Sequence, residues 1–187
     1  MPETAAMSQA VSIRPVDKGD AAALGSIHVR AWRETYQHLL PAEILADLSE
    51  TQRADMWTRI LADEHAGKNH VFGAWKDGEL IGFVSGGKSR SDVENSDSEL
   101  YAIYVLQCAQ RRQIGRRLFR TLTSQLFASG HRRMFLWVLQ GNSSSGFYER
   151  LGGHRGPPQE TTIGGRQFTE WSYVFELNES QTECVSD

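Results

Sequence analysis

Residues 100–129, LYAIYVLQCAQRRQIGRRLFRTLTSQLFAS, predict a strand, a tight basic turn and a helix. Residues 100–105 are all apolar or aromatic, which is typical of a strand buried on both faces. Apolar residues then recur every four positions from Ile114 to Leu126, which indicates the buried stripe of an amphipathic helix. The segment 110–116, QRRQIGR, connects the two elements.

The turn 110–116 predicts an anion site. Backbone N–H groups at the start of a helix lack partners and point to one place, with the positive end of the helix dipole behind them. Four nearby arginines add positive charge: Arg111, Arg112, Arg116 and Arg117. A phosphate or pyrophosphate is the expected ligand. Alternatively, part of this cluster is a solvated helix face, because Arg117 and Arg120 lie off the turn.

The rest of the chain predicts further strands and helices in one α/β domain over residues 11–177, between a disordered tail at 1–10 and a polar tail at 178–187. Apolar patterns and turn residues indicate strands at 11–16, 70–75, 80–85, 133–139, 161–163 and 168–177, and helices beginning after Asp20, Pro41 and Ser49 and at Asn142. Gly67 is expected to end the third helix, and Gly156-Pro157-Pro158 to form a loop. The strands at 100–105 and 133–139, joined by a helix, predict parallel pairing.

The composition is that of an ordinary globular chain. It has 187 residues, 40% hydrophobic and 23% charged, with a net charge of −3, which argues against a nucleic-acid binder that relies on overall charge. Cys108 and Cys184 are too few for a disulfide framework, and no Cys/His spacing predicts a metal site. No apolar run reaches membrane-spanning length and no secretory leader is recognisable, so the cytoplasm is the expected location and no membrane partner is expected.

Two motifs in this sequence resemble those of the GNAT (Gcn5-related) N-acetyltransferases. Residues 105–118, VLQCAQRRQIGRRL, are similar to the acyl-CoA motif Gln/Arg-x-x-Gly-x-Gly/Ala, with Gln110 and Gly115 matching and Gln113 in place of the first glycine. Residues 136–153, LWVLQGNSSSGFYERLGG, resemble the family's strand, asparagine and Phe-Tyr-x-x-x-Gly-Gly ending. The order of predicted elements over 11–177 is also the GNAT order.

The resemblance implies a single-domain α/β fold with a mixed central sheet splayed between the fourth and fifth strands, flanked by helices. It implies acetyl-CoA as the cosubstrate, no metal, and transfer of an acetyl group to a primary amine by direct attack in a ternary complex. The residues it places at the cosubstrate are Ile103, Tyr104, Val105, Gln110, Arg111, Arg112, Gln113, Ile114, Gly115, Arg116, Asn142 and Tyr148. Main-chain groups of 103–105 would pair with the pantetheine arm, and Tyr148 would lie near the sulfur as the acid that protonates the thiolate.

The acceptor side is less defined by the motifs. Glu99 matches a position where several GNAT enzymes keep a glutamate acting as base through water, so it is the preferred base candidate. Trp32, Glu34 and Tyr36, in the first helical hairpin, would line the acceptor cleft. The acceptor, a small molecule or a peptide amine, is not identified by the sequence. Homodimers are common in the family, but the sequence does not show one.

Several alternatives stay open. Tyr148 could be a core aromatic residue, Glu99 a solvated strand-edge residue, and Trp32 and Tyr36 packing residues on the sheet. The chain could also be a CoA-binding or regulatory module without catalysis, with Gln113 as a step towards loss. A nucleic-acid-associated protein using residues 111–120 and 132–133 is a further alternative, against which the net negative charge weighs.

Overall fold

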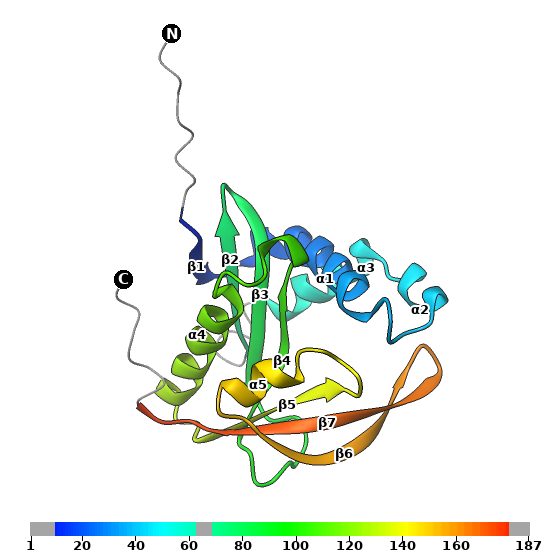
Figure 1. Cartoon of the computed structure of the whole chain (residues 1–187). Coiled ribbons are helices and arrows are strands. Elements are labelled where there is room, and N and C mark those ends of the chain that lie inside the picture. Colours follow the sequence, from blue (N-terminus) through cyan, green and yellow to red (C-terminus); the bar gives the residue numbers. More distant parts are fainter. Residues whose placement is uncertain (1–9, 63–68, 180–187) are drawn as a thin grey trace.

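The chain forms a seven-stranded mixed sheet with helices on its faces (Figure 1). The computed structural model describes residues 10–62 and 69–179. The strand order is β1-β2-β3-β4-β5-β7-β6, and among the described strands β4 and β5 form the parallel pair. The predicted single α/β domain with a mixed sheet is therefore confirmed. Of the predicted tails at 1–10 and 178–187, residues 1–9 and 180–187 lie outside the described residues, as does the predicted helix end at Gly67.

The elements follow the predicted order. The strands are β1 (Ser12–Pro15), β2 (Asn69–Lys76), β3 (Glu79–Lys88), β4 (Ser98–Val105), β5 (Arg133–Leu139), β6 (His154–Ile163) and β7 (Arg166–Glu176). The helices are α1 (Ala21–Tyr36), α2 (Ala42–Ala46), α3 (Glu50–Ile60), α4 (Ile114–Ala128) and α5 (Ser145–Arg150).

Two buried clusters fill the space on the two faces of the sheet. The predicted stripe of α4, including Leu118 and Leu122, packs on one face together with residues of β5 and β7. On the other face, Leu24 of α1 and Trp57 of α3 pack against Phe83 of β3. The sheet is thus covered on both sides near β3 and β4, which explains why these strands carry few polar residues.

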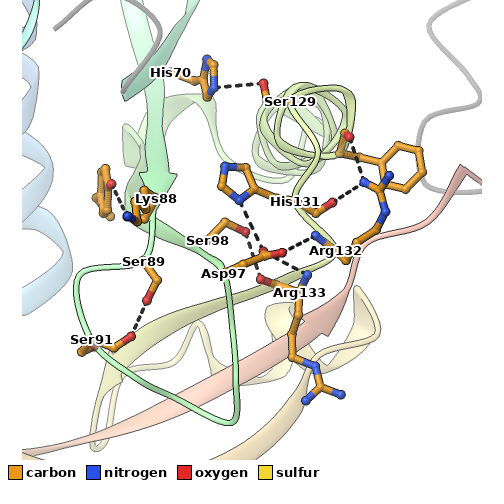
Figure 2. A network of polar contacts seen from close by, with 12 residues as sticks. His70, Lys88, Ser89, Ser91, Asp97, Ser98, Ser129, His131, Arg132 and Arg133 are labelled. Carbon is orange, nitrogen blue, oxygen red and sulfur yellow. Dashed lines mark hydrogen bonds and ion pairs between the residues drawn. The ribbon is translucent and has the colours of Figure 1, made fainter.

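A polar network holds the first residues of β4 and β5 together (Figure 2). The carboxylate of Asp97 accepts hydrogen bonds from the N–H groups of Arg132 (2.8 Å) and Arg133 (3.2 Å), and His131 Nδ1 lies 3.4 Å from it. The Asp97 N–H and the Ser98 hydroxyl both donate to the Arg133 carbonyl, each at 3.0 Å. These contacts fix the end at which the two strands meet.

Beyond that end the strands separate. The β4–β5 pairing consists of Ser98 with Met134 and Glu99 with Phe135, although both strands continue for several residues. β4 pairs with β3 from Ser98 to Val105, and from Leu100 onward β3 is its one partner among the described strands. β5 pairs with β7 along its whole length. The predicted splay between the fourth and fifth strands is confirmed.

The regular alternation of side chains between the two faces of a strand is interrupted at one position of β4. Gly86 of β3 pairs with Leu100 and Ser85 pairs with Ala102, so Tyr101 is an extra residue in a β-bulge. As a result Leu100 shares the α4 face with Ile103, whereas simple alternation would place them on opposite faces. A run of apolar residues gives no signal for such a bulge, because neither face is polar.

The hairpin at the C-terminal end also differs from the prediction. The expected loop Gly156-Pro157-Pro158 lies inside β6, which runs from His154 to Ile163. β6 is the edge strand of the sheet, and its register with β7 shifts between Arg155 and Pro158. Proline is tolerated there because an edge strand leaves one row of N–H groups unused and a bulge interrupts the ladder.

Asp20 does not cap α1 in the predicted way. It occupies the N-cap position, but its side chain makes no hydrogen bond to the helix N–H groups. Its carboxylate binds Arg14 (3.0 Å) and the N–H of Asp17 (3.2 Å), and Asp17 caps the short 3-10 helix (Lys18–Asp20) that precedes α1.

The buried imidazole of His28 should make folding sensitive to acid. His28 lies among the rings of Trp57, Phe83 and Tyr104, and burial, helped by the positive charge of Arg53, lowers its pKa from 6.5 to about 3. The His28 imidazole of the unfolded chain therefore takes up a proton near pH 6.5, whereas in the folded chain it stays neutral until about pH 3. Stability from this group is complete above pH 6.5 and falls as the pH drops towards 3, by up to about 1.4 kcal/mol per pH unit.

We expect His28→Phe to remove this acid sensitivity. Denaturant unfolding between pH 7 and pH 5 should show a shallower loss of unfolding free energy for His28→Phe than for the wild type, by about one proton's contribution. His38→Gln, a change at an exposed histidine, is the control and should keep the wild-type slope. Equal slopes for the wild type and His28→Phe would contradict the burial argument.

Candidate functional site

A cleft of about 1090 Å³ occupies the gap between β4 and β5. Its walls come from the C-terminal end of α1, the segment after β4, the first turn of α4, the middle of β5 and α5. These elements are distant in sequence, and the separation of the two strands brings them to one space. Most of the residues predicted for the cosubstrate lie on these walls.

One edge of β4 faces this cleft, and among the described strands none pairs with it beyond Glu99. The Leu106 N–H donates to Ile81 of β3 (3.0 Å), and main-chain groups alternate between the two sides of a strand, so Ile103 and Val105 face the gap. The Gln110 side chain confirms the direction, because its Nε2 donates to the Val105 carbonyl at 3.0 Å. Tyr104, predicted with them, turns its main chain towards β3 and contributes its side chain to the cleft instead.

The turn after β4 has the backbone of an anion-binding loop. Arg111 (φ 59°) and Gln113 (φ 61°) adopt left-handed conformations, and Arg112 between them does not. When left-handed and right-handed backbone conformations alternate, successive N–H groups point to the same side of the chain. Within the described residues, no acceptor is recorded for the N–H groups of residues 111–116, whereas the Arg117 N–H is bonded to Gln113. The unpaired amides expected from the sequence are therefore present.

The side chains of this turn divide into three groups. Arg111, Gln113 and Arg116 are exposed and line the cleft. Arg112 is exposed but does not line it, so its predicted contact rests on its main chain alone. Ile114 is buried in the core under the sheet and can offer only its N–H to a ligand.

Asn142 and Tyr148, predicted to contact the cosubstrate, both line the cleft on the side of β5 and α5. The Asn142 Oδ1 accepts from the N–H (2.9 Å) and the hydroxyl (2.8 Å) of Ser144, which leaves its NH₂ group to donate. Tyr148, on α5, is 8% exposed and its ring lies 5.9 Å from that of Tyr173. Burial raises the pKa of the Tyr148 phenol, so it is protonated at neutral pH.

The α1 wall carries a pair of tyrosines. The Tyr36 hydroxyl lies 3.2 Å from the Tyr104 hydroxyl, and burial raises the pKa of both phenols. Trp32 packs edge-on against Tyr36 with ring centroids 5.0 Å apart, and it does not line the cleft. The packing alternative therefore describes Trp32, while Tyr36 lines the cleft and its contact with an acceptor stays a prediction.

Glu34 lines the cleft but its carboxylate is already engaged. One oxygen accepts from Arg30 Nε (3.0 Å) and the other from the Gln107 N–H (2.7 Å). Glu34 thus connects α1 to the segment that follows β4. This contact positions the start of the anion-binding turn, which the sequence pattern did not indicate.

Glu99 is neither a solvated edge residue nor a lining residue of the cleft. It is 3% exposed on a central strand, so the edge alternative is wrong. Arg90 holds its carboxylate through Nη2 (2.5 Å), Nε (3.1 Å) and the backbone N–H (3.1 Å). Its carboxylate oxygens are occupied by Arg90 and it does not line the cleft, so the geometry does not support Glu99 as the base.

One further residue of the cleft was missed in the sequence. Trp137 lines the cleft from the middle of β5. Tyr104 was predicted through its main chain, whereas its phenol lies on the α1 side of the cleft. Both residues lie in runs without charged residues, where only the separation of the strands reveals which side chains reach a cleft.

Comparison with known proteins places this geometry in a family. The sequence model of the acetyltransferase (GNAT) family matches residues 17–153. The chain belongs to the GNAT acetyltransferase family. Over 161 residues it is 32% identical to an uncharacterised N-acetyltransferase, YuaI, of Bacillus subtilis, covering 86% of this chain and 90% of that protein.

Solved GNAT structures share the fold at low sequence identity. PaiA N-acetyltransferase of Thermoplasma acidophilum, in complex with coenzyme A, has a TM-score of 0.67 at 18% identity, covering 87% of this chain and 98% of that one. YncA of Salmonella typhimurium, with acetyl-CoA, has a TM-score of 0.66 at 20% identity, covering 91% and 96%.

The described residues of this GNAT chain show neither a helix long and apolar enough to cross a membrane nor a group of three side chains suited to hold a metal ion.

The left-handed backbone of Gln113 predicts a stabilising substitution. A residue with a Cβ is disfavoured in this conformation by about 1–2 kcal/mol, and glycine avoids the penalty at some cost in unfolded-state entropy. We expect Gln113→Gly to raise the unfolding free energy by about 0.5–1 kcal/mol in denaturant titration. Arg116→Gly, in the first turn of α4, is the matched control and should lower it. A lower unfolding free energy for Gln113→Gly than for the wild type would contradict the argument that Gln113 is strained.

Proposed function

We propose that this protein transfers an acetyl group from acetyl-CoA to a primary amine by direct attack in a ternary complex. One observation carries the proposal: the gap between β4 and β5 ends at the unpaired amides of residues 111–116 and has Asn142 and Tyr148 on its wall. Each of these features matches a part of the cosubstrate.

The residues present fit acetyl-CoA. Backbone amides at a helix start suit its pyrophosphate, and Arg111 and Arg116 add charge at the same turn. The outward main-chain groups of Ile103 and Val105 suit the amides of the pantetheine arm, which would lie along β4 as an added strand. The NH₂ group of Asn142 is positioned to donate to the same arm.

The chemistry then needs a polarised carbonyl and a proton donor. An outward N–H of β4 would stabilise the negative charge that develops on the thioester oxygen. The acceptor attacks as the neutral amine, after its ammonium form has lost a proton to solvent. The amine nitrogen attacks the carbonyl carbon, the C–S bond breaks, and the sulfur takes the proton of the Tyr148 phenol. The proton that the new amide nitrogen loses then restores the phenol, directly or through solvent. Burial raises the pKa of Tyr148, so the phenol is protonated at neutral pH and has a proton to donate. No covalent intermediate with the protein is required.

Cosubstrate binding is tested first. CoA at one hundred times its Kd should stabilise the folded chain by about 2.7 kcal/mol, which corresponds to a Tm increase of about 5–10 °C. Pantetheine, which lacks the pyrophosphate, should give a smaller increase because the amides of 111–116 stay unfilled. A melting curve unmoved by millimolar CoA would remove the donor site from the proposal. Thiol release from acetyl-CoA across a panel of amines then distinguishes catalysis from CoA binding alone.

Tyr148→Phe tests the proton donor. We expect kcat to fall by about 10²–10⁴, with CoA affinity nearly unchanged, because the ring stays and only the hydroxyl is lost. Tyr173→Phe is the matched control, since it removes the hydroxyl of a buried tyrosine whose ring lies 5.9 Å away. Equal turnover of Tyr148→Phe and the wild type would exclude Tyr148 as the acid.

A further inference from the structure

Glu170 is a carboxylate beside the cleft, next to residues that line it although not itself among them, and the steps above do not use it. It lies on β7 directly opposite Leu139 of β5. Phe168, two residues earlier on β7, packs in the cluster that contains Leu139 and Tyr36. Residues two apart on a strand share a face, so Glu170 lies on the face that borders Tyr36. No sequence motif pointed to it.

Glu170 differs from the other glutamates around the cleft in its partners. Glu34 and Glu99 each contact an arginine. Glu170 is half-buried, and its carboxylate accepts a hydrogen bond from the neutral side-chain amide of Gln159 at 2.7 Å. Within the described residues, no Lys, Arg or His lies at ion-pair distance from it. A partly desolvated carboxylate without a cation is unfavourable for folding, which favours a ligand as its partner.

Two aromatic residues of the cleft flank this carboxylate. Trp137 is its diagonal neighbour across the β5–β7 pairing, at a spacing that a large side chain can bridge. Tyr36 is close enough for the charge of Glu170 to raise the pKa of its phenol. Burial, with a smaller contribution from Glu99, raises the pKa of Glu170 itself, as expected for a carboxylate that lacks a cation. A carboxylate beside aromatic rings is a setting that suits an ammonium group.

We propose that Glu170 binds the acceptor in its ammonium form, between Tyr36 and Trp137, and thereby selects cationic primary amines. This inference rests on the proposed acetyl transfer, because it names the acceptor class of that site. It assigns to Glu170 the attraction of a cationic amine, a role for which Glu34 and Glu99, both paired with arginine, are unsuited.

Amine binding can be measured without acetyl transfer. The probe is 2-phenylethylamine, with 2-phenylethanol as its neutral counterpart, titrated into protein labelled with ¹⁵N at tryptophan. The indole signal of Trp137, assigned with Trp137→Phe, reports binding at this position. We expect Glu170→Gln to raise the Kd for the amine at least about 10-fold, equivalent to about 1.4 kcal/mol, and to leave the response to the alcohol unchanged.

Glu160→Gln is the matched control. Glu160 is an exposed glutamate on the same hairpin, where it accepts a hydrogen bond from Thr169, so its substitution removes the same charge without touching the cleft. The amine should bind Glu160→Gln as it binds the wild type. The proposal is overturned if Glu170→Gln keeps the wild-type Kd, if Glu160→Gln weakens binding equally, or if the amine leaves the Trp137 signal unmoved. Failure of acetyl transfer as such would show separately, in the CoA melting curves and in thiol release.

Discussion

The site depends on two parallel strands that are held together at one end and separate at the other. Asp97 and Ser98 bind the main chain at the start of β5, and pairing stops after Glu99. A sheet normally satisfies each strand edge with a neighbour, so the edge of β4 beyond this point carries main-chain groups that need a partner. An extended ligand with its own amides can supply one. The fold thus leaves this edge of β4 open where another strand would normally pair. The hydrogen bonds of Asp97 fix the place at which β4 and β5 separate.

The second constraint is the backbone of the turn after β4. A left-handed Gln113 and Arg111 store conformational strain in a segment whose N–H groups lack acceptors within the described chain. Strain of this kind is retained where the surrounding structure holds it in place. Here the Glu34 carboxylate holds the Gln107 N–H, and the Gln110 side chain holds the Val105 carbonyl, so the segment entering the turn is fixed from two sides. Gln113 therefore adopts, within a turn fixed by its surroundings, a conformation that glycine accepts at lower cost.

Much of the site could be read from residue patterns, and the failures have identifiable causes. The turn 110–116, Asn142 and Tyr148 were predicted because short motifs encode them locally. Glu99 was read as a base or a solvated residue, since a glutamate beside an apolar strand gives no sign of an arginine nine positions away. Glu170 lies in a strand that also carries Thr169 and Ser172, so its local sequence gives no sign that it differs from the other polar residues of β7.

The sequence by itself determined the order of elements, the doubly buried strands, the basic turn and the family, because these follow from hydrophobic periodicity and short motifs that act over a few residues. Tertiary structure alone decided the bulge at Tyr101, the strand that runs through Pro157, and which carboxylates have arginine partners. These features depend on register, on position at the centre or edge of the sheet, and on contacts between distant segments. The balance of charge around the cleft is of that second kind, because it depends on which carboxylates have arginine partners.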